Sequence, residues 1–249
     1  MNKHGTIHIL LMDEYLAVAN KGRFFTQEGL RAICQAHLSP KEDTSDSPFR
    51  DKKNAENFLN KIRDQRIAAY GNCPDDILEH ANAEAVLRNE YAGRILYELL
   101  QNAYDAVADR PIGNKGVGFK AVLNITDRPS IYSGVLCCEF IHERTKEKFA
   151  GAGLLKKPTQ QVPLLRLPFE IIRENKSSLI TGLIEKYDTV VVLPFRNRES
   201  LELFLIEWTE SLENETVLLF LPAIDKISWE HQTVNEYSLH GIVRLSVKS

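Results

Sequence analysis

The sequence lacks the long apolar run that a membrane-spanning helix requires. Its longest apolar stretches, residues 189–195 and 216–224, have the length of strands and fall short of the ~18 residues of a spanning segment. The first five residues, MNKHG, contain no hydrophobic region of the kind found in signal peptides. We therefore expect a cytoplasmic protein without a membrane anchor.

Cysteine and metal-binding patterns are also sparse. The four cysteines include no C-x-x-C pair, and the seven histidines show neither H-E-x-x-H nor H-x-H spacing. These patterns provide no basis for a disulfide scaffold or a zinc site. We expect the cysteines to be reduced thiols with mostly structural roles.

Neither sign of charge dominates the chain. The 31 Lys and Arg residues are balanced by 34 Asp and Glu residues, and 43% of all residues are hydrophobic. This composition is typical of a globular protein and excludes a collagen, a coiled coil and a disordered tail. It gives no general attraction to nucleic acid, although small basic clusters at Lys156-Lys157 and Arg196–Arg198 leave local binding open.

Apolar periodicity switches between the helical and the strand repeat, which predicts an α+β fold with a mostly antiparallel sheet and helices on one face. We expect strands at residues 5–11, 15–19, 130–133, 135–142, 146–150, 188–194, 216–221, 224–231 and 236–247. We expect helices at residues 26–37, 52–70, 83–109, 170–186 and 198–212, and a short one after residue 118. The polar residues 38–51, with two prolines, are expected to form a loop.

One face of the expected helix over residues 83–109 carries three polar side chains. Glu98, Asn102 and Asp105 are spaced i, i+4 and i+7, which places them on one helical face. An amide oxygen can bind Mg²⁺ while a neighbouring carboxylate activates water, so this face suits a Mg²⁺–nucleotide site. A solvated polar face of an amphipathic helix is the alternative reading.

A glycine-rich loop follows Pro111. It reads Gly113-Asn114-Lys115-Gly116-Val117-Gly118-Phe119-Lys120, and glycines before a helix let backbone amides approach phosphate oxygens. Lys115 and Lys120 could add positive charge. The loop is not a Walker A motif, because Phe119 follows its last glycine, and no expected strand precedes it as in a Rossmann fold. A flexible tight loop is the alternative.

Two strand ends carry further polar candidates. Asn20 ends the second expected strand, and Gly22 would let the backbone pass close to a ligand. Thr189 begins the buried strand over residues 188–194, where its hydroxyl could face a pocket. Taken singly, these residues also fit an ordinary turn and a threonine chosen for strand propensity.

Together, these four segments resemble the Bergerat-fold ATP-binding domain of the GHKL superfamily, which includes gyrase, the ninety-kilodalton heat-shock chaperone, histidine kinases and MutL. Residues 98–106 match the family's N box, E-x-x-x-N-x-x-D-A, and residues 113–119 match its glycine box, G-x-x-G-x-G-F. The runs IGNKGVGFKAVLNITDRPSIYS and LLFLPAIDKISW are similar to the sacsin-like branch. The resemblance implies a two-layer sandwich with ATP between the helices and the sheet.

The resemblance also implies roles for the site residues. Glu98 would be the general base that activates water, Asn102 would ligate Mg²⁺, and Asp105 would support the pocket by hydrogen bonds. The phosphate side would be formed by Gly113, Lys115, Gly116, Val117, Gly118, Phe119 and Lys120.

Two features depart from the family pattern. Asn20, with Gly22 beside it and Thr189 supporting the base, stands where the family has an adenine-reading aspartate, so affinity or base choice is expected to change. The segment order also differs, because the D-x-G-like strand in residues 1–44 precedes the N box. Placing residues 1–44 between Pro111 and Ile112 would restore the family order.

We expect one ATP-binding domain over residues 1–249, composed of the strand segment 1–44, the N-box helices in 45–111, and the glycine box with the C-terminal sheet in 112–249. It is expected to bind MgATP and hydrolyse it slowly, driving a conformational change in a larger protein or a client. The alternatives are a non-hydrolysing nucleotide sensor and an interaction domain, with nucleic acid as one partner. The family includes homodimers, but no residue pattern here fixes dimerisation.

Overall fold

The computed structural model describes residues 5–35, 48–107, 117–171, 177–213, 221, 224–232 and 238–244. Its strands are β1 (Gly5–Met12), β2 (Tyr15–Asn20), β3 (Ser130–Ser133), β4 (Leu136–Glu139), β5 (Phe169–Glu170), β6 (Thr189–Pro194), β7 (Ile224–Gln232) and β8 (Ser238–Arg244). Its helices are α1 (Gln27–Cys34), α2 (Lys52–Asn72), α3 (Asp76–Glu90), α4 (Ile95–Val107), α5 (Val117–Lys120), α6 (His142–Gly151), α7 (Ser178–Lys186) and α8 (Arg198–Glu213), with a 3₁₀ turn η1 (Ala121–Asn124).

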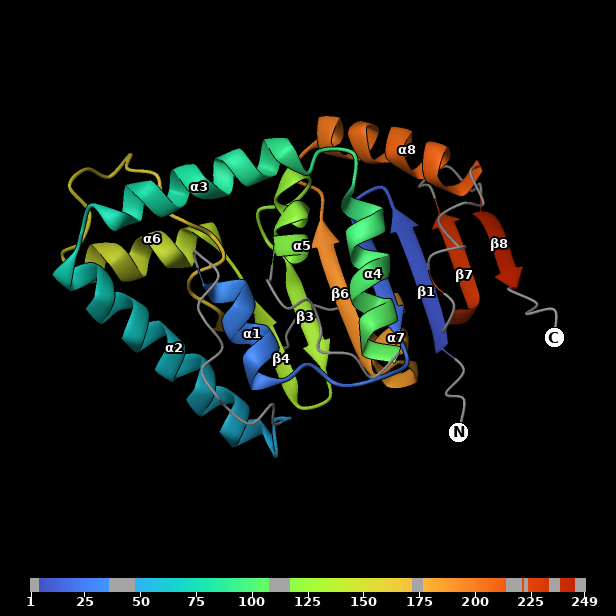
Figure 1. Cartoon of the computed structure of the whole chain (residues 1–249), viewed down its shortest axis with the longest axis horizontal. Coiled ribbons are helices and arrows are strands. Elements are labelled where there is room, and N and C mark those ends of the chain that lie inside the picture. Colours follow the sequence, from blue (N-terminus) through green and yellow to red (C-terminus); the bar gives the residue numbers. More distant parts are fainter. Residues whose placement is uncertain are drawn as a thin grey trace.

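All eight strands belong to one sheet, in the order β5-β4-β3-β6-β2-β1-β7-β8. Every neighbouring pair is antiparallel except β1 and β7, which run parallel. The sheet is therefore mixed and mostly antiparallel, and the α+β prediction is confirmed. The hairpin β1–β2 lies inside the sheet between β6 and β7 (Figure 1), so the first segment of the chain is part of the same core as the last.

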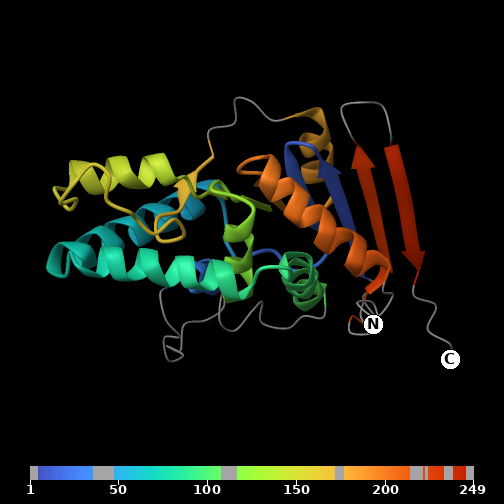
Figure 2. The same cartoon turned by 90° about the horizontal axis from the view of Figure 1, so that it is seen from above.

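Both faces of the sheet are covered, which corrects the prediction that all helices lie on one face. On β1, Ile7, Ile9 and Leu11 join a core cluster with residues of α1, α2, α4 and α8, while the alternate residue Leu10 joins a second cluster with α7. Figure 2 shows α7 across the sheet from α4. The alternation of side chains along a strand gives β1 two apolar faces, and each face needs a helix to cover it.

The helix expected over residues 83–109 is two helices, α3 and α4, with a break between them. At the break Gly93 has φ +74°, a left-handed conformation that glycine adopts without strain. The 3.6-residue stripe continues across Gly93 in the sequence, so the apolar pattern alone did not reveal the break. As a result the N-box residues lie on a helix of their own, α4, which packs over the sheet separately from α3 (Figure 1).

Other element predictions had mixed outcomes. Residues 146–150, expected as a strand, belong to helix α6, where Thr145 and Phe149 are buried one turn apart. Among the described residues of the helix expected over 170–186, Ser178–Lys186 is helical, whereas Phe169–Glu170 forms edge strand β5. Residues 38–47 of the expected loop, and all but Leu221 of the strand expected at 216–221, lie outside the described residues.

Candidate functional site

A pocket opens between the sheet and the helices that cover its first face. Its walls come from β2, α1, α4, α5 and β6, which are far apart in the sequence. The apolar part of the wall consists of Val18, Phe25, Gly29, Ile33, Leu99, Ala103, Ala106, Phe119 and Val191. The polar part consists of Asn20, Asn102 and Thr189, with Gly118 beside them. Of the residues expected to bind nucleotide, five therefore line one pocket: Asn20, Asn102, Gly118, Phe119 and Thr189.

A row of polar side chains runs across three adjacent strands, from Asn20 and Thr189 on the pocket wall to Ser133 beside it. Asn20 on β2 pairs with Thr189 on β6, and Thr189 pairs with Ser133 on β3. The Thr189 and Ser133 hydroxyls are 2.6 Å apart, and the Phe25 backbone amide donates to Ser133 Oγ at 2.8 Å. Ser133 thus fixes Thr189, a role that the sequence did not reveal because β3 and β6 are distant in the chain.

Asn20 is buried, with 5% of its surface exposed, and its Nδ2 has no hydrogen-bond partner in the described part of the chain. A buried amide nitrogen without a partner costs about 1–3 kcal/mol of stability. Such a group is a natural contact point for a ligand that supplies the missing acceptor.

The turn after β2 is held by two long-range contacts. The Gly22 backbone amide donates to Asp188 Oδ2 at 3.0 Å, and the Arg23 amide donates to the Ala106 carbonyl on α4 at 2.9 Å. Gly22 itself is not part of the pocket wall, so its observed contribution is to anchor this turn. Asp188 is a further residue that the sequence did not single out, although it directly precedes the predicted Thr189.

Helix α4 carries the three N-box side chains in different settings. Asn102 lines the pocket, whereas Asp105 lies off the wall and accepts a hydrogen bond from Gln101 Nε2 at 3.0 Å. The Glu98 side chain is 15% exposed, and burial raises the pKa of its carboxyl, an effect that Arg94 opposes. A carboxyl with a raised pKa is a stronger base than an exposed glutamate once it is ionised.

Glu98 lies directly against Gly118. A Cβ atom placed on Gly118 would overlap Glu98 Oε2, so only glycine leaves room for the carboxylate there. The glycine in this position therefore brings the beginning of α5 against the N-box helix. The earlier glycine-box residues Gly113, Lys115 and Gly116 lie outside the described residues, as does the side chain of Val117.

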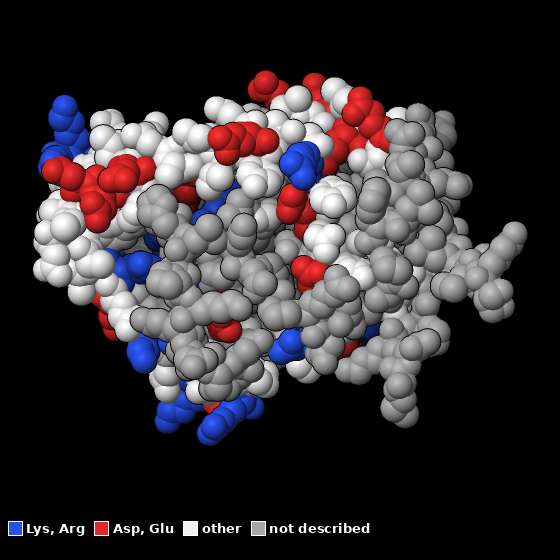
Figure 3. All heavy atoms as spheres, viewed as in Figure 1, with Lys and Arg blue, Asp and Glu red and all other residues white. Residues whose placement is uncertain are grey.

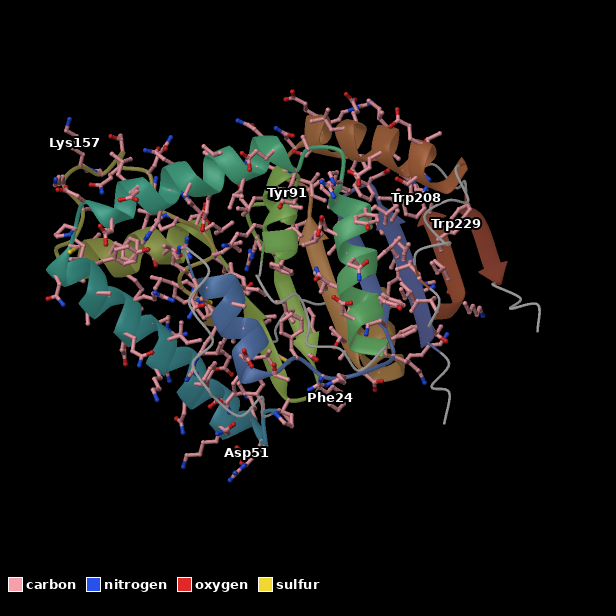
Figure 4. The ribbon with its side chains drawn as sticks, in the orientation of Figure 1. Phe24, Asp51, Tyr91, Lys157, Trp208 and Trp229 are labelled. Atoms are coloured by element: carbon pink, nitrogen blue, oxygen red, sulfur yellow. The ribbon has the colours of Figure 1, made fainter. Side chains whose placement is uncertain are left out.

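The beginning of α4 is stabilised by two groups. Glu207 of α8, buried at 5% exposure, accepts from the Leu96 backbone amide at 2.6 Å and so caps the helix, and burial raises its pKa. Arg94 lies over the rings of Tyr91 and Tyr97 and 3.7 Å from Glu98. Tyr91, labelled in Figure 4, is the residue at which α3 ends, before the break that precedes α4. The contact with Glu207 could not be predicted from the sequence, because 111 residues separate it from Leu96.

The Lys120 side chain points away from the pocket wall, so it adds no charge there. It is 2% exposed, and Lys120 Nζ donates to the Gln35 carbonyl at the end of α1 at 3.0 Å. Arg166, equally buried, donates to the neighbouring Cys34 carbonyl at 3.0 Å, and its positive charge lies near the carboxylate of Glu84. Burial, reinforced by the charge of Arg166, lowers the pKa of Lys120 to about 8.

The small basic clusters are matched by acidic partners. Arg196 pairs with Asp127 at 2.7 Å, Arg198 with Glu202 at 3.0 Å, and Lys156 with Asp75. Figure 3 shows acidic and basic side chains together on the visible face, where the described residues form no continuous basic patch. These contacts do not favour the nucleic-acid-binding alternative.

Within the described ranges, no three His, Cys, Asp or Glu side chains are close enough to bind a metal ion by themselves. A cation at Asn102 would therefore have to share ligands with a bound phosphate and water, as Mg²⁺ does in nucleotide sites. Among the same residues no helix is both long and apolar enough to span a bilayer.

No protein-family model matches this chain, and a search of curated proteins found no relative with significant similarity. The motifs and the pocket that they form are therefore the observations that bear on function.

Proposed function

We propose that this protein is an ATP-binding module that binds MgATP and hydrolyses it slowly. One observation carries the proposal: residues of four separate sequence motifs that suit nucleotide chemistry line a single pocket. A glycine box, a helical amide and two strand-end polar residues without a common role would be expected at separate places on the surface. The proposal includes a Bergerat-type sandwich, since the pocket lies between a mixed sheet and its covering helices.

The apolar wall suits a purine base, and the polar row of Asn20, Thr189 and Ser133 would read its edge. The space between the wall residues measures about 640 Å³ when its solvent-open part is included. The cavity that water-sized spheres can occupy has a volume of about 40 Å³, room for a few water molecules. Base binding therefore requires the helices to move apart slightly from the sheet.

Asn102 would hold Mg²⁺ through its side-chain oxygen, and it lies one helical turn beyond Glu98 on α4. The bound cation would neutralise phosphate charge and help to orient the phosphates. Glu98 would accept a proton from the attacking water, and its burial makes it a competent base. The backbone at Gly118 and Phe119, which begins α5, would approach the phosphates.

Isothermal titration calorimetry of the whole chain with ATP and Mg²⁺ tests binding directly. We expect saturable binding that weakens when EDTA removes Mg²⁺, and absence of any nucleotide binding would refute the proposal. Phosphate release by the wild type and by Glu98→Ala then tests catalysis. We expect the variant to bind ATP and lose hydrolysis by at least tenfold. Equal, negligible rates in both proteins would identify the non-hydrolysing sensor instead.

Nucleotide binding and hydrolysis by such a module would drive a conformational change. The proposal therefore includes other domains of a larger protein, or a client protein, to which this change is transmitted. Hydrogen exchange with and without ATP would locate the elements that respond. We expect increased protection in α1, α4 and α5, which surround the pocket.

A further inference from the structure

The amide of Asn20 is the polar group of the pocket wall that most needs a ligand. Its side chain is nineteen-twentieths buried, it lines the pocket, and its Nδ2 lacks a partner among the described residues. An amide presents one donor and one acceptor side by side, in contrast to a carboxylate, which presents two acceptors. The chemistry of this amide therefore bears on which base the pocket accepts.

The backbone of Asn20 is fixed on both sides. It pairs with Ile7 on β1 and with Thr189 on β6, and its carbonyl accepts from the Asp188 amide at 3.1 Å. The position of the side chain is thus set by the sheet, but the terminal amide can turn over and exchange its oxygen and nitrogen. Asn20 can offer the same place in the pocket either an acceptor or a donor.

Purine bases differ in the order of these groups on their pairing edge. Adenine presents a donor at its six-amino group and an acceptor at N1, whereas hypoxanthine and guanine present an acceptor at O6 and a donor at N1. An amide matches either edge with two hydrogen bonds by turning over. A carboxylate, which has only acceptors, matches one group on each edge: it accepts from the six-amino group but meets the N1 acceptor of adenine, and it accepts from N1 but meets the O6 acceptor of hypoxanthine and guanine.

The other residues of the pocket wall create no preference between six-amino and six-oxo purines. None of the described wall residues is charged, and the other polar groups nearby are the Thr189 and Ser133 hydroxyls, which both donate and accept. No fixed donor or fixed charge therefore distinguishes an amino from an oxo group at this end of the sheet.

We propose that the pocket accepts six-amino and six-oxo purine nucleotides alike, with Asn20 as the residue that determines this tolerance. The inference rests on the proposed function, because it presumes that the base of a nucleotide occupies this pocket. It extends the proposed ATP site to purine nucleoside triphosphates as a class.

Calorimetric titration of the wild type with MgATP and MgITP tests this inference. ITP is the sharper probe, because hypoxanthine differs from adenine at position six and N1 and lacks the two-amino group of guanine. We expect the two dissociation constants to agree within tenfold. An ITP constant weaker than that of ATP by tenfold or more would overturn the inference while leaving the proposed function intact, whereas binding of neither nucleotide would overturn both.

The variant Asn20→Asp tests the residue. We expect the dissociation constants of both ATP and ITP to rise at least tenfold over the wild-type values, because the carboxylate can donate neither to N1 of adenine nor to O6 of hypoxanthine. Asn82→Asp, on the exposed side of α3, makes the same chemical change away from the pocket and should leave both constants unchanged. A change of less than tenfold for either nucleotide in Asn20→Asp, with its circular dichroism preserved, would refute the role of Asn20. If that variant does not fold, the wild-type comparison still decides the inference.

Discussion

At the scale of single residues, the pocket depends on side chains that are buried with few partners. Asn20 keeps an unpaired amide nitrogen, Glu98 keeps a partly buried carboxyl, and Gly118 leaves the space that this carboxyl occupies. Each arrangement costs stability, and such costs are typical of binding and catalytic sites. The consequences of these contacts can be tested one residue at a time.

Gly118→Ala should displace the Glu98 carboxylate, because the added methyl group would overlap Oε2. We expect phosphate release to fall at least tenfold, while the dissociation constant of MgATP changes less than threefold. Gly151→Ala is the matched control, since a Cβ there has no atom within 4 Å. A Gly118→Ala protein with wild-type hydrolysis would show that the position of this carboxylate does not matter for the reaction.

Lys120 should make stability depend on pH. Its folded pKa is about 8, below the ordinary 10.5, so between these values the unfolded chain binds a proton that the folded protein lacks. The contribution of Lys120 to stability therefore rises with pH in this window, by up to ~1.4 kcal/mol per unit, and is constant below it.

Urea unfolding of the wild type and of Lys120→Met at pH 7 to 10 measures this effect. We expect the stability of the wild type relative to the variant to increase above pH 8. The difference is evaluated between pH 8 and 9, below the range in which Cys34, whose pKa is raised from 9 to about 12 by burial, has an opposing effect. The exposed Lys53→Met should give a curve parallel to the wild type. Parallel curves for Lys120→Met would contradict the prediction.

At the scale of elements, the break between α3 and α4 sets the direction of the N-box helix. Gly93 turns the chain, Glu207 of α8 caps the new helix, and Trp208 of α8 packs edge-on against Trp229 of β7 with ring centroids 5.7 Å apart (Figure 4). Helix α8 thus contacts both the N-box helix α4 and strand β7, which lies next to the edge strand β8. These contacts make the orientation of α4 a property of the packing rather than of its own sequence.

Gly93→Ala should destabilise the fold by about 1 kcal/mol, because alanine is strained at φ +74°. Gly182→Ala provides the opposite case, since Gly182 is exposed in α7, has no atom near its Cβ direction and has no positive φ. We expect that variant to gain about 0.5–1 kcal/mol from helix propensity. Denaturant unfolding measures both, and a stabilised Gly93→Ala would show that the break does not need glycine.

At the scale of the whole molecule, the order of segments along the chain does not decide where they pack. Strands β1 and β2 lie in the middle of the sheet although they come first, and their positions depend on pairing with β6 and β7. Ala106 near the end of α4 contacts Arg23, and Thr6 at the start of β1 contacts Lys21. Lys120 of α5 reaches Gln35 at the end of α1.

These contacts hold the first segment against Ala106, which precedes the junction between residues 111 and 112, and against Lys120, which follows it. A chain with residues 1–44 moved to that junction should therefore fold with the same strand order. We expect matching circular dichroism and MgATP affinity within threefold of the wild type. Deleting residues 1–44 should abolish cooperative unfolding, because it removes two central strands. Loss of cooperative unfolding in the rearranged chain would mean that the present order is required.

Local sequence patterns were sufficient to predict most helices and strands and to select the candidate residues of the site. Alternating apolar residues located β1, β2 and β6, and the spacing of Glu98 and Asn102 placed them on one helical face. The residues expected to contact nucleotide were recognised from their type and spacing. The strand predicted for residues 146–150 was wrong, because a segment of only five residues fits both the strand and the helical repeat.

Three features could be predicted from the amino-acid sequence alone. These are the α+β class, the positions of most helices and strands, and the set of polar and glycine residues that suit a nucleotide. These are local properties, because periodicity and spacing act within a few turns of the chain. The tertiary structure was needed to show that four of these residues line one pocket, namely Asn20, Asn102, Gly118 and Thr189. It was also needed to show that the Lys120 side chain points away from that pocket. It also supplied Ser133, Asp188 and Glu207, whose partners are 56 to 166 residues away in the chain. Contacts over such separations depend on sheet order and helix packing, which local sequence patterns do not determine.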